Sequence, residues 1–360
     1  MKFLSLLFLT FISTTCVFSR GNHATLVKND NQKIRYCGRI DIKDSATIMS
    51  WTGSSVLFNF HGNSVKAELG DEDGNNFFDV IIDGKVLKQL HLKKGKNEYT
   101  ICEGLKNTNH SVELFKITEA AFGRTYIYQF QLNRGAKLLA PTPVPKRKMV
   151  FFGNSITCGY GDEDSAGNNS APQYEDGYMS YAAITARKLH ADFHCISKSG
   201  IGVMVSWFPL IMPEMYDRLY YNDPDIKWDF SRYSPQIVVV NLFQNDSWIV
   251  KIPKNPEFKR QFGNKAPTPE FIVNAYESFI KKLINHYPNA KIVCALGNMD
   301  ATKSGSPWIG YIEKAVAGLG NKNLYTCIFP YKQTSGHPSE KEQLNMANQL
   351  TTFINRNIKW

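Results

Sequence analysis

The hydrophobic period of this chain changes at a proline-rich stretch, and that change restricts the possible folds more than any other feature. Between residues 34 and 139, apolar and polar residues alternate, as they do over residues 126–132. This period of two is typical of strands with one buried face. Residues 140–145 then carry prolines at alternate positions, which favours an extended connector. From residue 149 the pattern changes again, so we expect two domains of different class.

We expect the first domain, residues 25–140, to be an all-β sandwich or jelly roll. Its strand-like runs are short and separated by close turns, and no segment shows a helical period. The pair Asp83-Gly84 lies between the apolar runs 77–82 and 85–87. This pair predicts a hairpin, because a type I′ turn needs positive φ at both central residues.

The second domain, residues 148–360, alternates short apolar runs with segments whose apolar residues recur every three or four positions. This alternation predicts a three-layer α/β sandwich with a mainly parallel sheet. Such sheets bind ligands at the carboxyl ends of their strands. The expected strands cover residues 149–152, 193–196, 236–242, 291–296 and 324–329, and the expected helices cover residues 179–190, 269–286, 308–319 and 340–355.

The first 19 residues resemble a signal peptide. Lys2 precedes an apolar run over residues 3–12, and residues 17–19 form a small-x-small cleavage site. The run is too short for a membrane span, which needs roughly 20 apolar residues. Cys16 offers an alternative, a lipid anchor, although residues 13–15 match a lipobox poorly. We therefore expect an exported protein that is periplasmic, secreted or a surface-anchored lipoprotein, without a transmembrane span.

Cysteines and charge give no sign of a metal or nucleic-acid partner. Six cysteines remain beyond Cys16, and several lie in apolar strand-like runs, so we expect buried free thiols. The sequence contains neither C-x-x-C nor H-E-x-x-H, and a structural zinc or haem site has no support. The net charge is +10, but only residues 146–148 form a compact basic cluster. Dispersed charge of this kind is typical of a solvated surface, and we expect no nucleic-acid binding.

A candidate nucleophile follows the first strand of the second domain. Ser155 comes three residues after the apolar run 149–152, where a strand passes into a helix. A serine there exposes its hydroxyl at the carboxyl edge of the sheet, with its own backbone N–H close to a helix N-terminus. The alternative is a serine that only caps the helix.

Three more residues occur at predicted strand ends. Asn245 follows the strand that ends at Leu242, Gly200 follows the strand that ends at Ile196, and His337 lies just before the last helix. An amide side chain and a glycine N–H can stabilise an oxyanion, and a histidine can act as general base for a serine. Taken singly, the alternatives are an Asx-turn, a tight turn and a surface histidine. Their occurrence together at one edge favours a catalytic site.

This order of residues resembles the four blocks of the SGNH, or GDSL-like, hydrolases. The resemblance identifies Ser155 as nucleophile, His337 as general base, and Ser155, Gly200 and Asn245 as the oxyanion hole. More specifically, the chain resembles carbohydrate esterase family two, whose members join a jelly roll to an SGNH domain. That implies a serine esterase acting on an acetylated glycan, like an acetyl xylan esterase, without a metal or organic cofactor. The matching stretches are residues 51–53, 112–116, 153–161, 175–178, 199–203 and 336–339.

The chain departs from the family pattern in three places. Asn154 replaces the usual aspartate before the serine, a position thought not to carry the chemistry. Phe243 and Gln244 replace Gly-Thr before Asn245, and we expect them to reshape the pocket. Thr334 stands where most members have the acid of a catalytic triad.

Because that acid is missing, we expect a Ser–His dyad in which a backbone carbonyl orients the imidazole. The expected carbonyl lies in the turn over residues 333–335. The rival is a carboxylate from elsewhere, and Asp300, Glu340 and Glu342 are the nearest candidates along the chain.

Three tryptophans are candidates for stacking on sugar rings, namely Trp207, Trp248 and Trp308. Core packing is the alternative for each of them. A different reading of the whole chain is a catalytically weak or inactive carbohydrate-binding surface protein, which the missing acid favours. A further hypothesis is that the protein is a hydrolase of the same family that acts on a lipid or a thioester.

Overall fold

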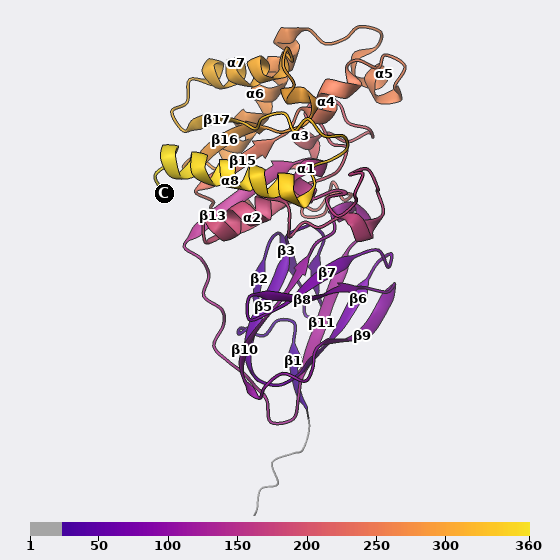
Figure 1. Cartoon of the computed structure of the whole chain (residues 1–360), viewed down its shortest axis with the longest axis vertical. Coiled ribbons are helices and arrows are strands. Elements are labelled where there is room, and N and C mark those ends of the chain that lie inside the picture. Colours follow the sequence, from indigo (N-terminus) through magenta and orange to yellow (C-terminus); the bar gives the residue numbers. More distant parts are fainter. Residues whose placement is uncertain (1–23) are drawn as a thin grey trace, which may run out of the picture.

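The computed structural model describes residues 24–360 and shows two domains stacked end to end (Figure 1). The predicted signal peptide and the possible lipid anchor at Cys16 lie outside the described residues. Within the described residues, no helix is long and apolar enough to cross a bilayer.

The N-terminal domain is a sandwich of two antiparallel sheets, which confirms the predicted all-β class. One sheet has the order β3-β4-β11-β6-β9 with β1 on β11, and the other has the order β12-β5-β10-β7-β8 with β2 on β5. Asp83 (φ 52°) and Gly84 (φ 77°) form the predicted turn between β7 and β8. The strands are β1 Thr25–Lys28, β2 Arg35–Cys37, β3 Ile40–Ile42, β4 Thr47–Met49, β5 Ser55–Gly62, β6 Val65–Asp71, β7 Phe77–Ile82, β8 Lys85–His91, β9 Gly95–Cys102, β10 Thr108–Lys116, β11 Thr125–Leu132 and β12 Lys137–Leu138.

The C-terminal domain contains a parallel sheet with the order β14-β13-β15-β16-β17. The α/β class is therefore confirmed as well. The chain leaves β13, pairs β14 on one side and returns to pair β15 on the other, so the sheet has its switch point at the end of β13. The strands are β13 Arg147–Gly153, β14 Ala191–Ser197, β15 Ile237–Asn241, β16 Lys291–Leu296 and β17 Leu324–Ile328. The helices are α1 Ser155–Cys158, α2 Tyr181–Lys188, α3 Met212–Met215, α4 Gln244–Ile249, α5 Pro256–Phe262, α6 Pro269–His286, α7 Trp308–Leu319 and α8 Glu340–Asn357.

Successive residues of the parallel strands pack into different helical layers. Val150 and Phe152 pack in the core that includes residues of α6 and α7, while Met149 and Phe151 pack in the core that includes residues of α2 and α8. This alternation follows from the period of two along a strand. It explains why the strands are apolar on both faces.

The predicted free thiols are confirmed. All six cysteines of the described residues are unpaired and buried.

The two domains share a polar and apolar interface in addition to the extended connector. Trp51 of the β domain is buried in the core of the α/β domain and donates its indole N–H to the Leu219 carbonyl at 2.7 Å. The backbone N–H of Gly177 donates to the Ile117 carbonyl at 2.9 Å across the same interface. The domains therefore pack as one body, with main-chain atoms in direct contact.

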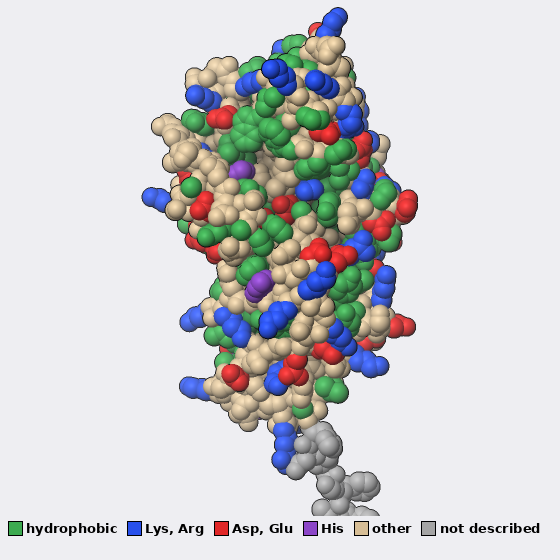
Figure 2. All heavy atoms as spheres, turned by 90° about the vertical axis from the view of Figure 1, so that its right-hand side faces the viewer, with side chains coloured by type: hydrophobic (Ala, Val, Ile, Leu, Met, Phe, Trp, Pro, Cys, Tyr) green, Lys and Arg blue, Asp and Glu red, His purple; other side chains and the backbone are tan. Residues whose placement is uncertain are grey.

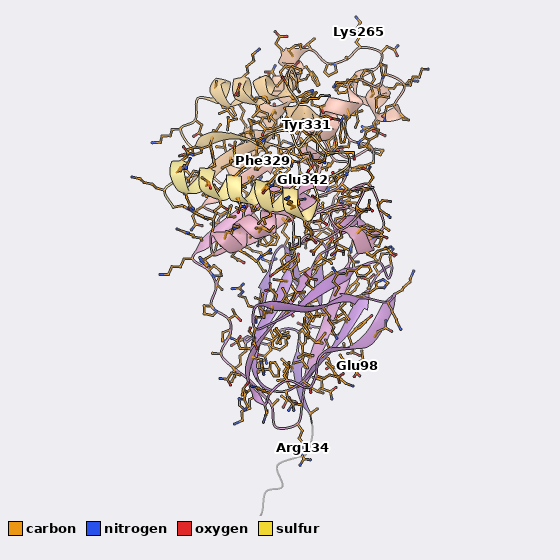
Figure 3. All side chains as sticks on the ribbon, viewed as in Figure 1. Glu98, Arg134, Lys265, Phe329, Tyr331 and Glu342 are labelled. Carbon is orange, nitrogen blue, oxygen red and sulfur yellow. The ribbon has the colours of Figure 1, made fainter. Side chains whose placement is uncertain are left out.

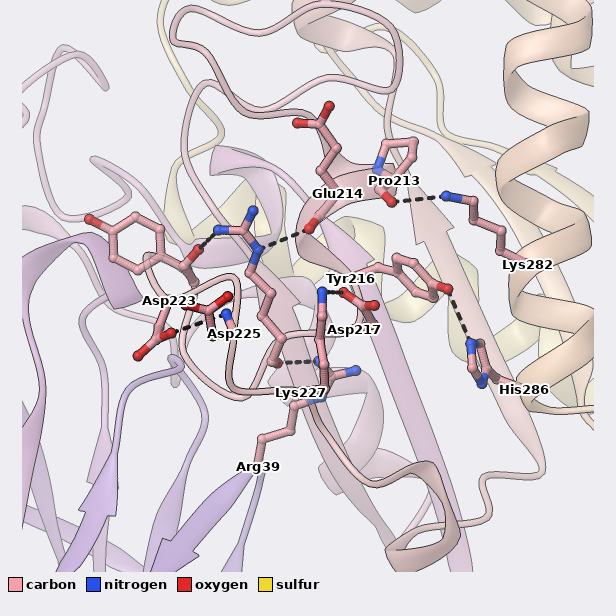
Figure 4. A network of polar contacts seen from close by, with 12 residues as sticks. Arg39, Pro213, Glu214, Tyr216, Asp217, Asp223, Asp225, Lys227, Lys282 and His286 are labelled. Atoms are coloured by element: carbon pink, nitrogen blue, oxygen red, sulfur yellow. Dashed lines mark hydrogen bonds and ion pairs between the residues drawn. The ribbon is translucent and has the colours of Figure 1, made fainter.

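A long connection between β14 and β15 lies against this interface, and polar contacts hold it in place (Figure 4). Lys227 bonds to Asp217 at 3.1 Å, and the Arg218 guanidinium donates to the Glu214 carbonyl at 2.9 Å. From the β domain, Arg39 donates to the Arg218 carbonyl at 2.7 Å. The connection is thus fixed by both domains.

Close approach at the interface predicts that Gly177→Ala destabilises the protein. A Cβ at Gly177 would lie 2.0 Å from Thr52 Oγ1 and 2.7 Å from the Ile117 carbonyl oxygen. Such overpacking costs about 1–3 kcal/mol of unfolding free energy, measurable by urea denaturation. The control is Gly310→Ala in α7, where a Cβ meets nothing within 4 Å, and this variant should gain about 0.5–1 kcal/mol. Equal stability of the Gly177 variant and the parent would contradict the tight interface.

Candidate active site

The candidate nucleophile begins helix α1, directly after β13. Asn154 is the N-cap residue, and its side-chain oxygen accepts a hydrogen bond from the Ile156 N–H at 3.1 Å. Ser155 is therefore not the capping residue, and its hydroxyl is free for other contacts. A Cβ at Gly153 would lie 1.9 Å from Thr157 Oγ1, so only glycine fits this tight turn.

His337 lies beside Ser155 in the geometry of a catalytic dyad. Its Nε2 is 2.9 Å from Ser155 Oγ, and its Nδ1 is 3.1 Å from the Gly167 carbonyl oxygen. A carbonyl only accepts hydrogen bonds, so the proton is assigned to Nδ1 and Nε2 is left to accept from the serine. The same carbonyl also accepts the backbone N–H of His337 at 2.8 Å.

The acceptor is thus a carbonyl, as expected, but its predicted position in the turn over residues 333–335 is wrong. Gly167 lies in the loop between α1 and α2. The rival carboxylates have other partners: Asp300 accepts from the Trp248 indole at 2.9 Å, and Glu342 accepts from the Ser339 N–H at 2.9 Å in the capping box of α8. Among the described residues, none of the three proposed carboxylates bonds to His337.

Burial shifts the protonation of the histidine. Desolvation lowers the pKa of His337 from 6.5 to about 4; the Gly167 carbonyl opposes the shift and the positive Lys332 adds to it. The imidazole is therefore neutral at ordinary pH and is able to accept the proton of Ser155.

The loop after β14 brings Gly200 and Asn245 together. The side chain of Asn245 donates to the Ile201 carbonyl at 2.8 Å and accepts from the Trp207 indole at 3.0 Å. An indole only donates, so these contacts fix which end of the amide is nitrogen and leave it a second N–H. Gly200 has a φ of 82°. The oxyanion roles of Ser155, Gly200 and Asn245 stay predictions.

Asp246 has a structural role that the sequence reasoning did not assign. Its carboxylate is fully buried and accepts the backbone N–H groups of Val203, Met204 and Val205, all at 3.1 Å or less. Burial raises the pKa of Asp246 to about 6, and the three N–H groups oppose this rise. The carboxylate fixes the loop that carries Gly200.

Phe243 and Gln244 do not reshape the pocket in the way expected. Phe243 is fully buried against Tyr276 and Trp308, with a φ of 80°. Gln244 is also buried and accepts the N–H of Ala301 at 3.2 Å. Both side chains therefore belong to the packed interior of the α/β domain.

A cavity of about 390 Å³ opens next to the dyad. Trp248 lines it, and Trp207 is 45% exposed beside Asn245, so both are accessible to a substrate. The prediction for Trp308 is wrong, since its side chain is only 2% exposed and packs edge-on against Phe243 in the core. The lining also includes Asn168, Met299, Asp300, Tyr331 and Lys332, which the sequence reasoning did not name as substrate contacts.

Tyr331 lines the cavity from the segment that connects the last strand to the last helix. It lies between β17 and α8, in the stretch that leads to His337, with Phe329 before it and Glu342 after it (Figure 3). Its position just after the predicted strand that ends at residue 329 could have indicated a contact with substrate, because such sheets bind ligands at the carboxyl ends of their strands.

Two family models match, one in each domain. Residues 36–143 match the carbohydrate esterase 2 N-terminal domain, and residues 151–329 match the GDSL-like lipase/acylhydrolase family. A family two carbohydrate esterase from Clostridium thermocellum, solved in complex with cellohexaose, is 33% identical with a TM-score of 0.80. The match covers 90% of this chain and 98% of that chain. The chain belongs to carbohydrate esterase family two. The predicted family is thereby confirmed.

Curated relatives agree with this assignment. The cellulase/esterase CelE of Acetivibrio thermocellus is 34% identical over 92% of this chain, although the chain spans only 40% of that relative's length. An acetylxylan esterase / glucomannan deacetylase of Cellvibrio japonicus is 24% identical over 98% of this chain and 96% of its own length.

The low pKa of His337 predicts the acid limb of the pH profile. The neutral imidazole is the active base, so kcat/KM for 4-nitrophenyl acetate should be retained as the pH falls below 6.5 and be halved only near pH 4. A steady decline centred at 6.5 or above would mean that the imidazole is solvated or paired with a carboxylate, contrary to this geometry.

Proposed function

We propose that this protein is a serine esterase that removes acetyl groups from an acetylated polysaccharide through a Ser155–His337 dyad. The observation that carries the proposal is the 2.9 Å contact between His337 Nε2 and Ser155 Oγ, with Nδ1 held by a main-chain carbonyl.

In the first step, His337 Nε2 accepts the hydroxyl proton as Ser155 Oγ attacks the ester carbonyl carbon. Negative charge then develops on the carbonyl oxygen. The backbone N–H groups of Ser155 and Gly200 donate to no other residue in the described part of the chain, and Asn245 keeps one amide N–H. These three donors support an oxyanion hole.

In the second step, the tetrahedral intermediate collapses. His337 returns its proton to the departing sugar oxygen, and an acetyl ester remains on Ser155. The neutral imidazole then activates a water molecule, which releases acetate and regenerates the serine. This sequence of steps needs no metal or organic cofactor.

The carbonyl of Gly167 has an electrostatic consequence. It holds the imidazole in the correct tautomer as a triad carboxylate would, but it carries no full charge to stabilise the imidazolium that forms during attack. Catalysis therefore relies more strongly on the oxyanion hole. The complete geometry of the dyad favours an active enzyme over a degenerate binding protein.

The lining of the cavity favours a carbohydrate over a lipid. Polar side chains of Asn168, Asp300 and Lys332 share the cavity with His337, whereas an acyl chain needs a long apolar groove. The indole of Trp248, held by Asp300, and that of Trp207 offer flat surfaces for sugar rings. The printed names of the relatives, acetylxylan esterase and glucomannan deacetylase, support the same substrate class.

The charge on the surface and the substrate class bear on where the protein is located. Basic and acidic side chains are interspersed over the face in Figure 2, which is typical of a solvated surface. Polysaccharide substrates are found outside the cell, so we propose that the protein is exported. The signal peptide at residues 1–19 and the alternative lipid anchor at Cys16 stay predictions.

We predict that Ser155→Ala lowers the rate of acetate release from acetylated xylan, glucomannan and pectin at least about a thousandfold. The reason is that Ser155 Oγ is the one hydroxyl hydrogen-bonded to His337 Nε2 within residues 24–360. Ser304→Ala, at an exposed serine, is the matched control and should retain full activity. Activity of the purified Ser155 variant close to that of the control would remove the nucleophile assignment.

A second pair of variants separates oxyanion stabilisation from substrate binding. Asn245→Ala should lower kcat by roughly a hundredfold or more with little change in KM, since it removes a transition-state donor. Trp248→Ala, which removes a lining residue of the cavity whose indole bonds to Asp300 and not to Asn245, should mainly raise KM for a polysaccharide. If Asn245→Ala changed only KM, its oxyanion role would be wrong.

A further inference from the structure

A carboxylate of the β domain enters the catalytic half of the molecule. Glu119 follows β10 and is only 4% exposed. Its Oε2 accepts the backbone N–H of Ser199 at 2.7 Å and lies 3.6 Å from the Cys158 thiol. Ser199 precedes Gly200, and Cys158 ends the helix that Ser155 begins. One oxygen atom therefore contacts the segments that carry two of the three candidate oxyanion donors, Ser155 and Gly200.

The main chain of Glu119 is itself fixed from two sides. Its N–H donates to the Glu175 carboxylate of the α/β domain, and its carbonyl accepts from Lys116 Nζ at 3.3 Å. Lys116 is fully buried and also donates to the Thr118 carbonyl at 2.7 Å. Because buried charges need such partners, the network determines where the Glu119 carboxylate lies.

Gly200 lies between two carboxylates that hold the same loop. Glu119 binds the N–H of Ser199 on one side, and Asp246 binds the N–H groups of residues 203–205 on the other. Between these two contacts, the Gly200 carbonyl accepts a hydrogen bond from the backbone N–H of Trp207 at 3.1 Å. The direction of the Gly200 N–H depends on these contacts.

We propose that Glu119 is a positioning residue through which the β domain sets the Gly200 N–H of the oxyanion hole. The inference rests on the proposed function, because it takes Gly200 as an oxyanion donor. Oxyanion donors act only within a narrow range of distance, about 2.7–3.1 Å from the developing charge. A displacement of about 1 Å in such a group can cost about a hundredfold in rate. The β domain is then a part of the active site as well as a neighbouring module.

The test compares Glu119→Ala and Glu119→Gln with a matched interface variant, Tyr220→Phe. Tyr220→Phe removes another interdomain hydrogen bond, from the Tyr220 hydroxyl to Asp41 at 2.6 Å, and keeps the hydrogen bonds of the Gly200 loop. Glu119→Ala should lower kcat about ten- to a hundredfold with KM changed less than about threefold. Glu119→Gln keeps an acceptor for the Ser199 N–H and should restore kcat to within about threefold of the parent. Tyr220→Phe should leave kcat unchanged.

Hydrogen exchange supplies a readout that does not depend on activity. Amides of residues 198–203 should exchange faster in Glu119→Ala than in the parent or in Tyr220→Phe. Equal exchange in this segment, or a kcat of Glu119→Ala that matches Tyr220→Phe, would overturn the inference. A parent enzyme without hydrolytic activity would instead overturn the proposed function, whatever the exchange shows. If Glu119→Ala does not fold, Glu119→Asp, which withdraws the carboxylate by one carbon, is judged by the same two criteria.

Discussion

The hydrogen bond from His337 Nδ1 to the Gly167 carbonyl is the contact on which the whole site depends. It fixes the tautomer and the ring, so that Nε2 faces Ser155 at 2.9 Å. The bond requires a close approach of two main chains, because a Cβ at Gly167 would lie 2.8–2.9 Å from backbone atoms of His337. Gly167 also has a φ of 66°, a conformation that glycine adopts without strain. The loop between α1 and α2 therefore supplies the acceptor that orients the imidazole, the positioning part of the role of an aspartate in a triad.

The remaining parts of the site are held by buried carboxylates and by contacts across the domain interface. Asp246 fixes the loop that follows β14 from within the α/β domain, and Glu119 contacts the same loop from the β domain. Trp51 joins the cores of the two domains. This arrangement explains how a chain with an extended connector still forms one rigid catalytic unit.

Much of the fold was predictable because it depends on local patterns. The period of hydrophobicity indicated both domain classes, and Asp83-Gly84 indicated its hairpin. The site was predictable where strand ends converge, as for Ser155 and His337. The Gly167 carbonyl was not, because a main-chain acceptor 170 residues from His337 leaves no signal in residue type. Trp308 was misjudged, although its spacing with Ile312 and Ala315 follows the buried stripe of α7.

Covalent labelling with a serine-directed fluorophosphonate tests both the nucleophile and the group that orients its base. We expect the probe to label Ser155, identified by peptide mass spectrometry, and His337→Ala to slow this labelling strongly because the general base is lost. We also expect Asp300→Ala and Glu342→Ala to be labelled at the parent rate, since a carbonyl orients the imidazole. Labelling at another serine, no labelling at all, or a rate that depends on either carboxylate would contradict a Ser155–His337 dyad held by Gly167.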